Sequence, residues 1–132
     1  MATPAPPKVT PTKAIIVDGV EMTYHTGAQR FHALKGIDLE VLSGDVQLLM
    51  GPSGSGKTTL LSILGGILTP TAGSVYLFGQ KITNLSPAKL AKLRLENIGF
   101  IFQDFNLFPA LTAAENVEMA LNLRGIRGRA AR

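Results

Sequence analysis

Two stretches near the start of the chain have the apolar pattern of strands. Residues 14–24 are rich in β-branched side chains. Residues 34–41 alternate, with Ile37, Leu39 and Val41 apolar and polar side chains between them, as along a strand with one buried face. Both stretches are therefore predicted to be strands. Asp18 followed by Gly19 is typical of a hairpin turn, so the pattern leaves open either a hairpin or one kinked, continuous strand.

Three further apolar runs are short and bounded by turn residues, a pattern that predicts buried strands. They comprise residues 46–50, 75–78 and 98–102. Gln47 interrupts the first run, and the pattern offers no reason for a polar side chain there.

Three segments have the apolar spacing or the start signals of a helix. The first is predicted over residues 57–68, with Gly65 weakening its last turn. The second begins at Ser86, a capping hydroxyl followed by proline at the first helical position. The third begins with a capping box over residues 112–115 and ends at Gly125.

The loop before the first helix matches the spacing G-x-x-x-x-G-K-[S/T]. It consists of Gly51, Pro52, Ser53, Gly54, Ser55, Gly56, Lys57, Thr58 and Thr59. A strand before this motif and a helix after it are the context in which it binds phosphate, whereas a chance glycine-rich turn would need neither.

The chemistry of this loop is that of anion binding. The start of a helix presents free backbone N–H groups and partial positive charge, and glycines let the backbone curl around a phosphate. Lys57 adds a full charge for the outer phosphates, and Thr58 offers a hydroxyl oxygen to Mg²⁺. The sequence therefore predicts a nucleotide-binding site.

Composition narrows the remaining classes. The chain has 132 residues, enough for one domain at most, and it has no cysteine for disulfides or zinc. No apolar run approaches the roughly 20 residues that span a bilayer, and no secretory signal is visible. The net charge of +4 includes a C-terminal basic stretch without aromatic residues, which favours a solvated surface over nucleic-acid binding. Residues 1–12 contain four prolines and predict a disordered leader.

Several other segments occur in a fixed order around the loop. They are Tyr24 and residues 34–37, 43–45, 70–75, 98–103, 106–109 and 111–117. Together they resemble the ATP-binding subunit of ABC transporters, most of all the branch that includes lipoprotein-releasing and macrolide-export ATPases. The resemblance implies an α/β fold of the P-loop NTPase class, here an incomplete ABC-type nucleotide-binding domain with an N-terminal antiparallel β-subdomain.

The resemblance also implies a division of the chain and settles the reading of one turn. It implies a β-subdomain over residues 13–44, a phosphate-loop core over residues 45–104 and the start of a helical subdomain over residues 105–132. It favours the kinked, continuous strand over a hairpin at Asp18 and Gly19.

Individual roles follow from the same resemblance. Tyr24 would stack on adenine, and Gln103 would contact Mg²⁺ and the attacking water, with Lys57 as the catalytic cation. Phe105, Leu107 and Phe108 would line the cleft where a membrane-spanning subunit docks. Each role has a plainer structural alternative. Tyr24 could be a core tyrosine, Gln103 a polar cap at a strand end, and the three apolar residues ordinary core.

The implied function is an ATP-hydrolysing motor with ATP and Mg²⁺ as cofactors. The family pairs two such domains as a homodimer, and the partner subunit would hold the protein at the cytoplasmic face of the cell membrane. No nucleic-acid partner is expected.

The family also uses a signature loop, an Asp-Glu pair and a switch histidine, and none of these occurs in the 132 residues at the required place. We therefore expect the N-terminal part of a longer ATPase, poorly stable alone and able to bind Mg·ATP without hydrolysing it.

Two other function classes stay open. A soluble ABC-type ATPase acting on nucleic acid or ribosomes would open into a coiled coil after Gln103, whereas residues 105–116 continue as in transporters. An unrelated phosphate-loop kinase or GTPase would not need Tyr24 or Gln103, and the guanine-reading Asn-Lys-x-Asp motif is absent.

Overall fold

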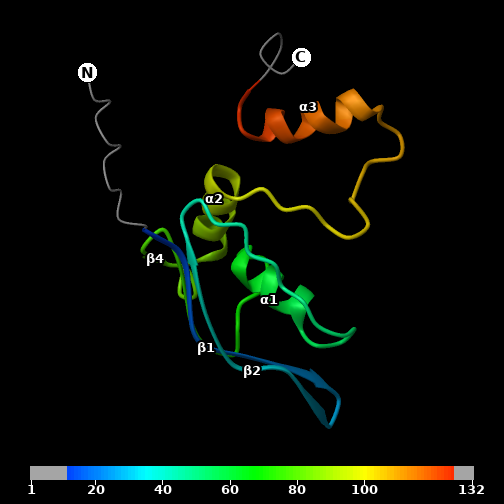
Figure 1. The fold of residues 1–132 in the computed structure, drawn as a ribbon. Helices are drawn as coiled ribbons and strands as arrows, with labels where there is room; N and C mark the ends of the chain where they lie inside the picture. Colours follow the sequence, from blue (N-terminus) through cyan, green and yellow to red (C-terminus); the bar gives the residue numbers. More distant parts are fainter. Residues whose placement is uncertain (1–11, 127–132) are drawn as a thin grey trace, which may run out of the picture. The chain divides into compact units, whose positions relative to one another are not determined.

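The computed structural model describes residues 12–126, which divide into a first unit ending at Leu85 and a second beginning at Ser86. Its elements (Figure 1) are β1 (Lys13–Thr26), β2 (Gln29–Leu42), α1 (Lys57–Leu64), β3 (Ala72–Leu77), β4 (Gln80–Lys81), α2 (Pro87–Asn97) and α3 (Ala113–Leu123). All but the last residue of the predicted leader, and the chain after residue 126, lie outside the described residues.

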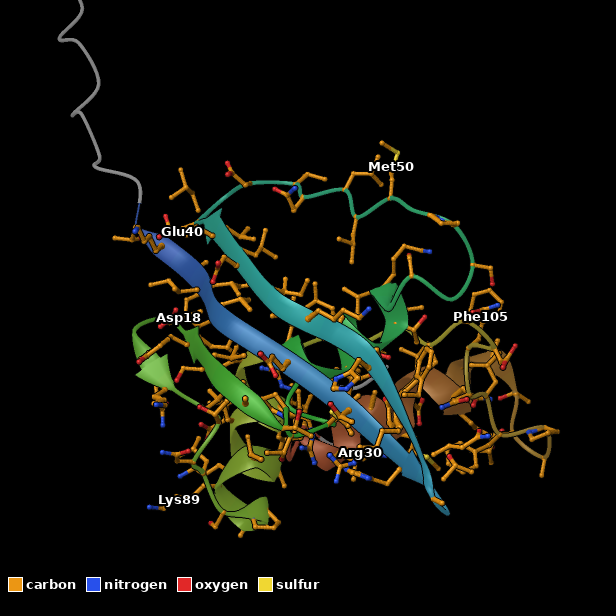
Figure 2. All side chains as sticks on the ribbon, turned by 90° about the horizontal axis from the view of Figure 1, so that it is seen from below. Asp18, Arg30, Glu40, Met50, Lys89 and Phe105 are labelled. Atoms are coloured by element: carbon orange, nitrogen blue, oxygen red, sulfur yellow. The ribbon has the colours of Figure 1, made fainter. Side chains whose placement is uncertain are left out.

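The first unit is built on an antiparallel sheet in the order β2-β1-β3-β4. Figure 2 shows β1, β2 and β3 side by side. The strands and α1 supply the core side chains Val17, Val20, Met22, Leu34, Val41, Leu60, Ile63, Val75 and Leu77. The two predicted N-terminal strands and the antiparallel β-subdomain are confirmed, and β2 begins five residues earlier than predicted.

β1 continues through the dipeptide that resembled a hairpin turn. Its pairing with β2 shifts by one residue between Val17 and Val20, which marks a bulge. Gly19 takes the left-handed conformation with φ 55°, and its N–H donates to a carboxylate oxygen of Asp38 at 2.7 Å. The kinked, continuous strand is confirmed, because the turn residues bend the strand without reversing it.

The predicted buried strand at residues 46–50 does not form. These residues carry no strand pairing, Figure 2 places Met50 on an extended loop, and Val46 is 99% and Leu48 71% exposed. A strand exists only through hydrogen bonds to a neighbour, and no strand among residues 12–126 pairs with this run. The loop conformation also leaves Gln47 in solvent, so its polar side chain needs no partner.

Two other predictions need correction. Residues 98–102 form no strand, and Ile101 is 85% exposed, although the rings of Phe100 and Phe102 lie 4.6 Å apart. The missing neighbour is again the physical reason. α1 ends at Leu64, four residues before the predicted end, because Gly65 takes the C-cap position.

The second unit confirms both predicted helix starts. Ser86 caps α2 by accepting a hydrogen bond from the backbone N–H of Lys89, and the following proline occupies the first helical position. Thr112 and Glu115 form a reciprocal capping box at the start of α3. None of the α3 side chains is buried, so capping rather than core packing defines where this helix begins.

The exposure of residues 46–50 predicts that a charged side chain can replace Leu48 with little loss of stability. Leu48→Glu should change the free energy of unfolding by less than about 0.5 kcal/mol, because the side chain already faces water, and should reduce light scattering by removing apolar surface. The same change at the buried Leu60 is the matched control and should destabilise strongly. If urea titrations showed that Leu48→Glu and Leu60→Glu lose equal amounts of stability, residues 46–50 would be buried.

The α3 capping box predicts a pH dependence. Hydrogen bonds from the backbone N–H and the hydroxyl of Thr112 lower the pKa of Glu115 in the folded chain. The ionised Glu115 therefore stabilises α3, and this stabilisation is complete above the ordinary glutamate pKa of about 4.3. That contribution should be lost as pH falls through the lowered native pKa. Far-UV circular dichroism should show a larger acid loss of helix in the wild type than in Glu115→Gln, and identical curves would contradict it.

Candidate functional site

The predicted phosphate loop borders a cavity of about 300 Å³ in the first unit. The cavity is lined by β2, the loop and the start of α1, through Leu34, Ile37, Leu49, Met50, Gly51, Pro52, Ser55, Gly56, Lys57 and Leu60. Apolar walls from the sheet and polar groups from the loop therefore share one hollow, the usual composition of a ligand site.

Lys57 is the first residue of α1, and its ammonium group is bound by the loop that precedes the helix. Its ammonium donates to the carbonyl oxygens of Gly51 at 2.7 Å and Pro52 at 2.6 Å, and to the hydroxyl of Ser55 at 3.2 Å. These bonds fold the loop around its own cation. The positive charge is thereby held inside the curve of the backbone, where an anion would be bound.

The start of α1 supplies the second part of an anion site. Gly56 is the N-cap residue and has no side chain to occupy the N–H groups of the first turn, and that turn contains no acidic residue. The first α-helical bond joins the Leu60 N–H to the Gly56 carbonyl, which leaves the preceding N–H groups without helical partners. Thr58 and Thr59 lie in this turn, so their amides face the place where a phosphate would bind.

Glycine is required at the N-cap for a steric reason. Gly56 has φ 89°, and a Cβ there would lie 2.6 Å from the carbonyl oxygen of Ala33 and 2.8 Å from the Leu34 side chain. Gly54 has φ 79° with open space around it, so only its backbone conformation demands glycine. Gly56 is thus the point where the loop closes against β2.

Side chains that could hold a divalent metal ion do not cluster in the described part of the chain. No group of three His, Asp or Glu side chains among residues 12–126 could hold a metal ion. Thr58 at the start of α1 offers one hydroxyl oxygen. A Mg²⁺ ion at this loop would therefore depend on phosphate and water oxygens beside Thr58, as Mg²⁺ often does.

The other predicted site residues fall in both units. Tyr24 lies on β1, and the residue is 38% exposed, so it is not a fully buried core tyrosine. Gln103 lies in an exposed turn of the second unit, after the unpaired residues 98–102. Its role toward a nucleotide in the first unit stays a prediction.

The apolar loop predicted to dock a partner is exposed. Phe105, Leu107 and Phe108 each show more than half of their surface, which argues against ordinary core packing. Asn116 on α3 holds this loop: its side chain accepts from the Phe108 N–H at 2.8 Å and donates to three carbonyl oxygens, those of Phe108, Leu111 and Thr112. The sequence alone gives Asn116 no role, because its contacts with Phe108 and Leu111 depend on how the preceding loop folds.

Comparison with known proteins identifies the family. Residues 34–131 match the family described as ABC transporter. The chain is 46% identical over 107 residues to MJ0796 of Methanocaldococcus jannaschii, an uncharacterized ABC transporter ATP-binding protein, covering 81% of this chain and 46% of that protein. It is 42% identical over 114 residues to LolD of Xanthomonas oryzae pv. oryzae, a lipoprotein-releasing system ATP-binding protein, covering 86% and 47%.

A solved structure shows the same fold. The dimeric structure of the MJ0796 cassette superimposes with a TM-score of 0.81 at 45% identity, covering 86% of this chain and 49% of that one. A related structure of MJ0796 holds ADP and phosphate. The predicted ABC-type α/β fold is confirmed, and the chain spans about half the length of these two relatives.

The two loop glycines form a matched pair for a test of the site. Gly54→Ala should lower the free energy of unfolding by about 1–2 kcal/mol, the strain of a residue in the left-handed conformation. Gly56→Ala should lower it clearly more, because backbone atoms of Ala33 must also move. Urea titrations followed by circular dichroism compare the two variants, and equal costs would show that the loop is not closed against β2.

Proposed function

This chain belongs to the ABC transporter family, and we propose that it forms the nucleotide-binding part of an ATP-hydrolysing subunit that powers a transporter. The observation that carries the proposal is the loop geometry, in which Lys57 is held by two loop carbonyls beside the open N-terminus of α1. A triphosphate needs this combination of a cation and several backbone donors.

The proposed ligand is ATP with Mg²⁺. Residues 51–59 bind the phosphates, with Lys57 at the outer ones, and Thr58 ligates the metal ion when it is bound. Tyr24, part-exposed on the same unit, stacks on the adenine. By the family resemblance, the proposed role of Gln103 is to contact the metal ion and the attacking water.

Hydrolysis by this chain alone is not part of the proposal. Phosphoryl transfer depends on positioning and charge stabilisation, and the described residues contain no carboxylate cluster to position water and metal. We propose that the chain binds Mg·ATP, and that hydrolysis requires the signature loop and Asp-Glu pair that its 132 residues do not contain.

The proposed partner is a membrane-spanning transporter subunit. The exposed Phe105, Leu107 and Phe108, fixed by Asn116, offer an apolar docking surface for it. None of the helices within residues 12–126 could span a bilayer. The proposed partner subunit is the reason to place the protein at the cytoplasmic face of the cell membrane. The dimeric MJ0796 structure supports pairing of two such domains, and similarity to LolD supports a lipoprotein-releasing or export branch.

Removal of the loop cation tests the nucleotide site. Lys57→Ala should weaken Mg·ATP binding by about tenfold or more, because charge-assisted bonds contribute about 1.5–3 kcal/mol each. Lys35→Ala removes an exposed lysine from β2 and is the control. Isothermal titration calorimetry measures both affinities.

Two results would contradict the proposal in different ways. Equal ATP affinity in the wild type and in Lys57→Ala would remove the loop from the binding site. Steady phosphate release by the pure chain, abolished in Lys57→Ala, would show that hydrolysis needs none of the additional motifs.

A further inference from the structure

We propose that Phe31 is a second aromatic ring of the site, which receives the nucleotide base together with Tyr24. We call the pair Tyr24 and Phe31 the base platform. This inference rests on the proposed function, because it adds a specificity residue to the same nucleotide site. Phe31 belongs to none of the motifs found in the sequence.

The strand register places Tyr24 and Phe31 directly opposite each other on neighbouring strands. Tyr24 on β1 is the direct cross-strand partner of Phe31 on β2, and such partners project from the same face of a sheet. The preceding pair, Thr23 and His32, projects from the other face, where the Thr23 hydroxyl lies 3.0 Å from Nδ1 of His32. β1 and β2 form a hairpin, and the base platform lies on the face opposite to Thr23 and His32.

A bulge decides which face that is. Met22 pairs with Leu34, and the next pair is Thr23 with His32, so β2 holds one extra residue at Ala33. In a regular strand, residues three apart project to opposite faces. The extra residue cancels this difference, and Phe31 shares the buried face of Leu34.

The same bulge is the contact between the hairpin and the phosphate loop. The Ala33 carbonyl is the backbone group that leaves no room for a Cβ on Gly56. Leu34 lines the loop cavity together with Lys57. Tyr24 lies two residues beyond Met22, the partner of Leu34, so at about 3.3 Å per residue the base platform lies roughly 7 Å further along the β1–β2 hairpin, a span that the sugar between a phosphate and its base can bridge.

Exposure separates the base platform from the core on the same face. Met22 and Leu34 are buried, whereas Tyr24 is 38% and Phe31 60% exposed. Figure 2 shows this arm of the hairpin with Arg30 labelled, close to the turn and one residue from Phe31. Two uncovered rings in line with a phosphate site suit a flat aromatic base, and stacking on such a ring contributes about 1–3 kcal/mol per base.

The test separates the base from the phosphates. Calorimetry should compare Mg·ATP with inorganic triphosphate, which has the phosphates but no base, on the wild type and on Phe31→Ala. We expect Phe31→Ala to weaken ATP binding by about tenfold and to leave triphosphate binding unchanged. Phe78→Ala, which removes another exposed phenylalanine from the first unit, should change neither affinity.

A purely structural role would give a different result. Cross-strand aromatic pairs also stabilise hairpins. If Phe31 did only this, its loss would weaken the binding of Mg·ATP and of triphosphate equally. Phe31→Leu keeps apolar packing but removes the ring, so it carries the test if circular dichroism shows that Phe31→Ala is unfolded. It should lower ATP affinity and spare triphosphate.

The outcomes keep the two levels of the proposal apart. Wild-type chain that binds neither ligand would overturn the proposed function and this inference with it. Wild-type chain that binds ATP, with both Phe31 variants unchanged or weakened equally for the two ligands, would overturn the inference alone.

Discussion

The close approach of the phosphate loop to β2 is the constraint on which the first unit depends. At Gly56 the loop backbone meets the Ala33 carbonyl with no space for a side chain. From this contact α1 starts, so the contact also sets where the free N–H groups and Lys57 are placed. A local steric requirement therefore fixes the electrostatics of the whole site.

The strand side of the same contact is equally informative. The bulged residue Ala33 meets the loop, while its neighbours Leu34 and His32 turn to opposite faces of the hairpin. One irregularity in the sheet thus joins the phosphate loop, the core and the exposed rings at the end of the hairpin. Bulges near functional sites commonly re-aim side chains in this way.

Local signals in the sequence predicted local structure well. Three signals report interactions within a few residues: the alternation within residues 34–41, the capping residues Ser86 and Thr112, and the loop spacing that ends at Thr58. The kink at Gly19 needed the family resemblance, because a turn dipeptide alone does not distinguish a bulge from a hairpin.

Non-local structure could not be predicted from the same signals. An apolar run such as residues 46–50 has the composition of a buried strand, but its pairing depends on a neighbour that the run itself does not encode. The position of Phe31 could not be predicted for a related reason. Only the register shift at Ala33 brings Phe31 to the face of Tyr24. Gln103 and the phosphate loop lie in different units, and their joint role stays a prediction.

The unpaired run before Gly51 has a thermodynamic consequence for the loop that follows it. The helical side of the loop is anchored at Gly56, whereas residues 46–50 have no ladder bonds to hold the other side. Ordering those residues carries an entropic cost that bound nucleotide would have to offset. By linkage, a polypeptide that pairs with residues 46–50 in their nucleotide-bound conformation would tighten nucleotide binding, and nucleotide would tighten that pairing by the same factor.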